Sequence, residues 1–162
     1  MKELFEKLNR LTLDNKLDYL IDTCFFIWIF EHNKEKKFEK FIRKNRCGLT
    51  SFNAEELIHV THHIHDKLKE SERHFFHHKS NLFIIDIPVH PGNCEDEHRF
   101  VSSILPELDL VEPDPSDAVI LAAAIKTHAD VLTRDKHDMF NARLENYLNK
   151  YNVKVLNTFP KN

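Results

Sequence analysis

Short apolar segments of strand length alternate along this chain with longer segments of helical periodicity. Strands joined through helices pair in parallel, because each helix carries the chain back to the same edge of the sheet. We therefore predict one α/β domain over residues 1–162, with a mostly parallel sheet of roughly four to five strands flanked by helices. The strands are predicted at 17–22, 47–51, 82–89, 129–133 and 153–156. The helices are predicted at 2–15, 34–45, 53–78, 94–105, 118–125 and 140–150, with 1–16 as an N-terminal helical extension.

Glycine is scarce in this chain, which contains only Gly48 and Gly92. Phosphate-binding loops, dinucleotide-binding loops and the nucleophile elbow of esterases each need several glycines, because backbone and ligand approach closely there. The sequence therefore argues against a nucleotide-cofactor enzyme and against a serine esterase.

The composition indicates a soluble protein of a reducing compartment. Apolar residues make up 41% of the chain and the formal net charge is -3, which is ordinary for a globular domain. The three cysteines form no CxxC pair, and the N-terminal segment MKELFEKLNRL carries acids, unlike a secretory signal. The longest apolar run, 24–30, is far shorter than the roughly 20 residues of a membrane span. We expect a cytoplasmic protein without a membrane partner.

Four acidic residues follow strand ends or begin helices that return to the same edge. If the sheet is parallel, their side chains meet at the carboxyl ends of the strands, where such sheets bind ligands. A cluster of carboxylates without thiolate or obligatory imidazole suits a hard cation such as Mg²⁺ or Mn²⁺. Metal ions held in this way support in-line hydrolysis of phosphodiesters. The four residues are Asp22, Glu56, Asp117 and Asp135.

Each of these acids also has an ordinary structural interpretation. Asp22 is suitably placed to cap a helix, and Glu56 has the spacing of a capping-box partner of Asn53. Asp117 lies in a helix start in which Asp114 is the candidate cap, and Asp135 suits a surface loop. Acids near helix N-termini are common, so the functional hypothesis depends on the four occurring together.

Three stretches of the sequence resemble the PIN-domain family, and within it the small VapC-like ribonucleases. They are YLIDTCFFIWIFE at 19–31, LTSFNAEELIHV at 49–60 and PSDAVILAAAIKTHADVLTRDKHDMF at 115–140. The last is the most specific, because an acid opens an alanine-rich helix that precedes a short strand ending in Thr-Arg-Asp. In order and spacing the resemblance covers residues 17–157.

The resemblance implies a metal-dependent endoribonuclease that uses Mg²⁺ or Mn²⁺ and leaves 5′-phosphate and 3′-hydroxyl ends. It implies that Asp22, Glu56, Asp117 and Asp135 are the catalytic and metal-binding residues, with Thr133 in support. It also suggests that the protein is the toxin of a toxin–antitoxin pair, with RNA as substrate and an antitoxin protein or a second copy as partner.

Two positions in the acidic set have a neighbouring competitor. Glu55 precedes Glu56, and we choose Glu56 because the pattern puts the acid directly before an apolar residue. Asp138 is an alternative metal ligand to Asp135 in the loop TRDKHDMF.

The twelve histidines suggest a different kind of site. His59 and His63 have the spacing of a helical zinc pair, and His90, Cys94 and His98 repeat at four-residue steps. No HExxH motif accompanies them, so a zinc-binding protein is kept as a second alternative. The remaining histidines of this region are His62, His65, His74, His77 and His78.

Basic residues are concentrated in NKEKKFEKFIRKNR, residues 33–46. A nuclease with an acidic pocket must still attract a polyanion, and a basic flank next to the strand ends would serve. We predict RNA contacts for Arg43, Lys44 and Arg46, and for Arg134 and Lys136, which flank Asp135. The alternative is a solvated amphipathic helix. For the whole protein, the main alternative to a nuclease is an RNA-processing or RNA-binding component with weak or no catalysis.

Overall fold

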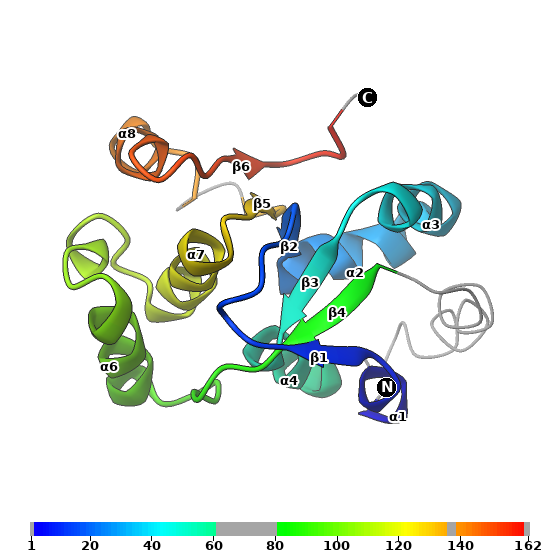
Figure 1. The fold of residues 1–162 in the computed structure, drawn as a ribbon, viewed down its shortest axis with the longest axis horizontal. Coiled ribbons are helices and arrows are strands. Elements are labelled where there is room, and N and C mark those ends of the chain that lie inside the picture. Colours follow the sequence, from blue (N-terminus) through cyan, green and yellow to red (C-terminus); the bar gives the residue numbers. More distant parts are fainter. Residues whose placement is uncertain (1, 61–80, 136–138, 161–162) are drawn as a thin grey trace.

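A computed structural model of the protein describes residues 2–60, 81–135 and 139–160. Its centre is a six-stranded sheet in the order β1-β4-β3-β2-β5-β6, with every pair parallel (Figure 1). The predicted α/β fold with a parallel sheet is confirmed, with one strand more than expected. The strands are β1 (Asn9–Leu11), β2 (Tyr19–Ile21), β3 (Cys47–Thr50), β4 (Leu82–Ile85), β5 (Asp130–Leu132) and β6 (Val155–Leu156).

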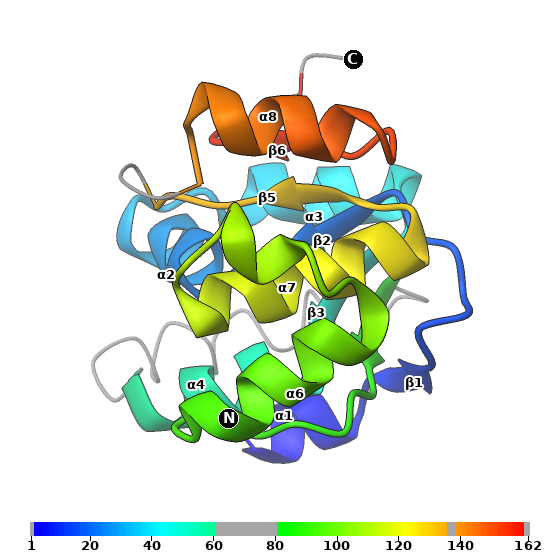
Figure 2. The same cartoon turned by 90° about the vertical axis from the view of Figure 1, so that its left-hand side faces the viewer.

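Helices cover both faces of the sheet (Figures 1 and 2). One hydrophobic core joins the sheet to α6 (Cys94–Ile104), the 3₁₀ turn η2 (Leu108–Leu110), α7 (Pro115–Thr127) and α8 (Ala142–Asn149). A second core joins the other face to α1 (Lys2–Glu6), α2 (Thr23–Glu31), α3 (Glu35–Lys44) and α4 (Ser51–Val60). None of the helices in the described residues is long and apolar enough to span a membrane.

The inner strands β2, β3 and β4 are largely apolar because both of their faces are buried. Leu20 belongs to the core under α7 and the next residue, Ile21, to the core under α2. Val131 and Leu132 divide in the same way in β5. Successive side chains of a strand point to opposite faces, so a sheet covered on both sides selects continuous apolar runs rather than alternation.

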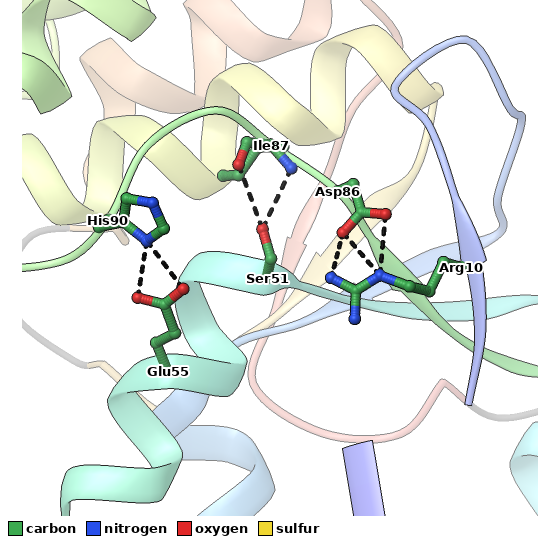
Figure 3. A network of polar contacts seen from close by, with 6 residues as sticks. All are labelled: Arg10, Ser51, Glu55, Asp86, Ile87 and His90. Atoms are coloured by element: carbon green, nitrogen blue, oxygen red, sulfur yellow. Dashed lines mark hydrogen bonds and ion pairs between the residues drawn. The ribbon is translucent and has the colours of Figure 1, made fainter. Parts of the chain in front are cut away.

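The N-terminal segment differs from the sequence prediction. The helix expected over 2–15 ends at Glu6, and Asn9–Leu11 forms the edge strand β1 beside β4. Arg10 of this strand forms an ion pair with Asp86, which follows β4 (Figure 3). Strand pairing and this contact with a distant residue outweigh the local helical pattern, which is a weak preference. The predicted strand 82–89 is also shorter, since β4 ends at Ile85.

The helix starts that flank the site are set by local capping. Asp114 accepts hydrogen bonds from the backbone N–H groups of Ser116 and Asp117, and Pro115 occupies the first turn of α7. The predicted start of this buried helix is therefore confirmed. The segment 24–30, which the sequence left open between strand and helix, is part of α2. The predicted continuation of α4 beyond Val60 lies outside the described residues.

Candidate active site

The predicted acids gather at the carboxyl edge of the sheet. Asp22 follows β2 directly, and Thr133 follows the neighbouring strand β5 directly. Asp117 lies in the first turn of α7, and the last turn of this helix leads the chain into the amino end of β5. The start of α7, with Asp117, therefore lies at the carboxyl edge. We call this region the acidic edge and define it by Asp22, Glu56, Asp117 and Asp135.

Asp22 is 8% exposed and is held by donors on both of its oxygens. Oδ1 accepts from the backbone N–H of Thr23 at 2.7 Å, so Asp22 is the N-cap of α2, as its structural interpretation predicts. Oδ2 accepts from the Thr133 hydroxyl at 2.7 Å and from the Cys24 thiol at 2.8 Å. Burial raises the pKa of Cys24 to about 12, which keeps this thiol a donor. The carboxylate is therefore fixed in one orientation.

Glu56 lies beside Asp22, although the two residues are far apart in the sequence. The Thr23 hydroxyl donates to Glu56 Oε2 at 2.6 Å, and the Asn53 amide donates to the same oxygen at 3.3 Å. Asn53 also lies 3.4 Å from Asp22 Oδ1, so it bridges the two acids. Glu55 points elsewhere and pairs with His90 at 2.8 Å (Figure 3). The structure thus brings Glu56, and not Glu55, into the acidic edge.

The predicted local roles of Asn53 and Glu56 require a correction. Helix α4 begins at Ser51, immediately after β3, and the Thr50 hydroxyl accepts the backbone N–H of Asn53. Thr50 therefore caps the helix, and Asn53 lies inside its first turn instead of preceding it. Glu56 lies one turn further along than expected and is not a capping-box partner.

The charges of the acidic edge act on one another. Burial raises the pKa of Asp22 most, and the charge of Asp135 raises it further, while hydrogen bonds from Cys24, Thr133 and Thr23 act in the opposite direction. Burial, followed by the charges of Asp22, Asp114, Asp135 and Glu112, raises the pKa of Asp117 to about 8. Carboxylates that raise one another's pKa in this way repel when all of them are ionised, and a bound cation would relieve that repulsion.

Burial also raises the pKa of Glu56, and the charges of Asp22 and Glu97 add to the effect. Glu97 of α6 is a buried acid that the sequence analysis missed. It accepts from the Gly92 backbone N–H at 3.0 Å and from the Ser116 hydroxyl at 3.3 Å. Its position three residues before Phe100 puts it on the buried stripe of an amphipathic helix, which is the signal that could have identified it.

The residues of the acidic edge fit a hard divalent cation by their chemistry, since their available ligands are carboxylate oxygens. In residues 2–60, 81–135 and 139–160, however, no three acidic, histidine or cysteine side chains converge closely enough to hold a metal ion. The carboxylate oxygens of the acidic edge and their mutual repulsion therefore suit a metal ion. The side chains of the acidic edge are nevertheless too far apart to form a complete coordination shell. Asp138, the alternative ligand, lies outside the described residues.

The histidines with described positions do not form a common site. His90 pairs with Glu55, and His98 of α6 lies 3.3 Å from Asp109. Cys94 is exposed and His59 lies at the far end of α4, also exposed. The proposed repeat of His90, Cys94 and His98 fails because His90 precedes α6 and turns toward α4. His62, His63, His65, His74, His77 and His78 lie outside the described residues.

The predicted basic residues separate into two groups. The Arg134 guanidinium lies 4.8 Å from the Trp28 ring and donates to the Asn157 carbonyl at 2.8 Å, next to the acidic edge. Arg43, Lys44 and Arg46 instead lie where α3 leads into the amino end of β3. A basic flank next to the strand ends was the expectation for these three, and their placement at the opposite edge corrects it. Lys136 lies outside the described residues.

A parallel sheet covered by helices on both faces, with carboxylates at the carboxyl ends of its strands, is the arrangement in which α/β proteins place their ligand sites. The family model of the PIN domain matches residues 19–143, well over half of the chain. The chain therefore belongs to the PIN-domain family, whose fold is generally that of a metal-dependent nuclease. No curated protein sequence matches the chain.

Proposed function

We propose that this protein is an endoribonuclease that hydrolyses phosphodiester bonds of RNA with Mg²⁺ or Mn²⁺ bound by Asp22, Glu56, Asp117 and Asp135. One observation carries the proposal: at a single sheet edge, burial, followed by the charges of the acids around it, raises the pKa of Asp117 to about 8. Natural sequences tolerate such repulsion mainly at functional sites. The chemistry of carboxylate oxygens suits a divalent ion, and membership of the PIN family suits a nuclease.

The residues of the acidic edge have distinct parts in this proposal. A divalent ion bound there supplies an activated water and stabilises charge on the phosphate oxygens. Asp22 is held rigidly by Thr23, Cys24 and Thr133, so it offers its oxygens in a fixed direction. Glu56 is steered toward Asp22 by Asn53. Preorganised ligands of this kind lower the cost of assembling the site.

The proposed substrate is single-stranded RNA or a loop within a folded RNA. A flexible strand can bend a phosphate toward the acidic edge, whereas an A-form helix is stiff and holds its phosphates at fixed positions. Arg134, and Lys136 beside it in the sequence, are the proposed contacts to flanking phosphates. Contacts of this type make binding weaken with salt.

We also propose a more specific role, that of a VapC-like toxin whose partner is an antitoxin protein or a second copy of the chain. This proposal rests on the resemblance of the three sequence stretches. Its test is expression in a bacterial host, where the wild-type chain should arrest growth and Asp22→Asn should not. Normal growth with active, soluble enzyme would leave a nuclease without a toxin role.

The direct test of the nuclease proposal is cleavage of a labelled single-stranded RNA with Mg²⁺, with Mn²⁺ and with EDTA. We expect cleavage with either metal and none in EDTA. Loss of one oxygen ligand removes several kcal/mol of catalysis, so Asp22→Asn should lower the rate by at least about 100-fold. Asp14→Asn is the matched control, because Asp14 is an exposed loop residue away from the acidic edge. Metal-independent cleavage, or equal loss in both variants, would contradict the proposal.

A further inference from the structure

Four basic side chains of α3 line a hollow of about 300 Å³ at the side of the molecule away from the acids. The C-terminal segment forms the other wall through Phe159 and Pro160. We call this hollow the basic groove and define it by the residues that line it, which are Lys37, Lys40, Phe41, Arg43, Lys44, Phe159 and Pro160. No acid is among the residues that line it in the described part of the chain.

The walls of the basic groove are built on firm packing. Phe159 is 4% exposed, and its ring packs against those of Phe25, Phe38 and Phe41 at centroid distances of 5.2, 6.3 and 5.1 Å. The Lys37 ammonium lies 5.2 Å from the Phe159 centroid. The C-terminal segment is therefore fixed to α3 by an aromatic cluster, and the groove does not depend on a loose chain end.

A continuous row of contacts connects the acidic edge with the basic groove. Arg134 adjoins Asp135 and stacks on Trp28 in the middle of α2. Trp28 lies 6.2 Å from Phe159, which in turn contacts Lys37. The successive distances along this row are 4.8, 6.2 and 5.2 Å, so the charges of Arg134 and Lys37 lie at most about 16 Å apart. Single-strand binding folds cover about 4–16 nucleotides. A strand of that length is long enough to contact the acidic edge and the basic groove together.

We propose that the basic groove is an accessory site for the phosphate backbone of single-stranded RNA, which it holds while the acidic edge acts on a bond further along the strand. The proposal rests on the proposed function for the identity of the polymer. The charge of the basic groove supports this proposal, because three exposed lysines and an arginine line the same hollow. Among these four residues of α3, which is described throughout, Arg43 alone has an acidic partner on the same helix, Glu39 at 2.5 Å. Like charges gathered in this way gain most from a polyanion, which releases its counterions on binding.

The aromatic rings of the basic groove indicate how the polymer is recognised. Phe41 and Phe159 are 6% and 4% exposed, so neither ring offers a free face on which a base could stack. Recognition therefore falls to the lysine and arginine side chains, which contact phosphates and carry no sequence information. Single-stranded DNA of the same length should bind the basic groove about as well as RNA does.

The experiment measures binding of labelled single-stranded oligonucleotides in EDTA, where the strand is not cut. The groove variant is Lys37→Gln, Lys40→Gln and Lys44→Gln together, and the control is Lys2→Gln, Lys36→Gln and Lys126→Gln, which removes the same charge at exposed positions outside the groove. The probes are RNA of about 20 and about 5 nucleotides and DNA of about 20 nucleotides. Circular dichroism checks that both variants fold.

For the long probes we expect the groove variant to bind at least about 10-fold more weakly, and its plot of log K against log salt to be shallower by about 2, since each lost phosphate contact in a single strand contributes about 0.7. The control should change little, and the short RNA should lose less affinity in the groove variant than the long RNA does, because fewer of its phosphates can contact the basic groove. Equal weakening in both variants, or unchanged binding of the long RNA, would overturn the proposal; in the second case an acidic protein becomes the better candidate partner. Because cutting is not measured, a failure of the nuclease proposal would show separately, as absence of cleavage with metal.

Discussion

The hydroxyl of Thr50 determines which way the amide of Asn53 faces. It accepts the backbone N–H of Asn53 at 3.0 Å, so its own proton is directed to Asn53 Oδ1 at 2.6 Å. With its oxygen occupied there, the amide presents its NH₂ group to Asp22 and Glu56. A capping interaction at the start of α4 is thereby linked to the orientation of two acids that follow neighbouring strands.

The first prediction is that Asn53→Ala weakens metal binding more than it weakens the fold. Without the amide, Glu56 keeps only the Thr23 hydroxyl as a donor among the described contacts and is no longer tied to Asp22. Residues that orient metal ligands typically contribute 10- to 100-fold to affinity, so calorimetry should show Mn²⁺ affinity falling by about 10-fold or more. Asn45→Ala removes an amide that bonds Phe41 O at the amino side of the sheet, and it should leave Mn²⁺ affinity unchanged. Equal Mn²⁺ affinity in all three proteins would limit Asn53 to a structural role.

The second prediction concerns stability and pH in the metal-free protein. The pKa of Asp117 is about 8 in the fold, against an ordinary value near 3.8. For an acid whose pKa is raised by folding, the protonated form is favoured in the folded state, so stability is highest below the unfolded value and falls as pH rises toward 8. Asp117→Asn removes this loss. In EDTA at pH 8 the variant should be more stable than the wild type by about 1–2 kcal/mol, allowing for solvent screening, and the difference should vanish near pH 4.

Thermal unfolding at pH 4, 6 and 8 measures this difference. Asp114→Ala is the informative companion, because Asp114 caps α7 and its loss should cost about 1 kcal/mol. If Asp117→Asn were also destabilising at pH 8, Asp117 would be a structural residue of the helix start, and the repulsion argument would fail.

Local patterns were sufficient to predict much of this fold. The parallel sheet, the capped start of α7 and the grouping of Asp22, Asp117 and Thr133 follow from strand–helix alternation and from residues adjacent to strand ends. What the sequence could not supply is contact between distant segments. The strand Asn9–Leu11 exists through its pairing with β4, and Glu97 is buried through its contacts with Gly92 and Ser116.

The basic residues show the same limit in a different way. Their clustering in 33–46 is visible in the sequence, but the edge of the sheet at which they lie depends on the direction of α3. Helix α3 leads into the amino end of β3, which places Arg43, Lys44 and Arg46 away from the acids. Charge patterning therefore predicted a basic surface without predicting its distance from the acidic edge.

The third prediction is that Thr133→Val destabilises the protein while Thr133→Ser does not. The Thr133 side chain is fully buried; its hydroxyl donates to Asp22 Oδ2 and accepts the Asp135 backbone N–H at 3.1 Å. Valine has a similar shape but leaves both groups without that partner, which costs about 1–3 kcal/mol. Thr127→Val is the matched control, because this buried hydroxyl only adds bonds to helix carbonyls that are already used. Urea unfolding should rank Thr133→Val as the less stable variant, and a reversed order would contradict the role given to Thr133.

The fourth prediction is that metal binding releases a proton from Asp117. A carboxyl with a pKa of about 8 is largely protonated at pH 7, and it must lose that proton before it can bind a cation. As the pH is raised toward 8, Mn²⁺ affinity should therefore increase about 10-fold per pH unit, and above pH 8 it should stay constant. Calorimetry at pH 7 in two buffers with different ionisation enthalpies should show close to one proton released by the wild type. Asp117→Asn should bind Mn²⁺ more weakly at pH 8 and release almost no proton, whereas Asp14→Asn, at an exposed site, should behave as the wild type does. Binding without proton release in the wild type would mean that the ion does not engage Asp117, and the ligand set proposed for the acidic edge would then be wrong at that residue.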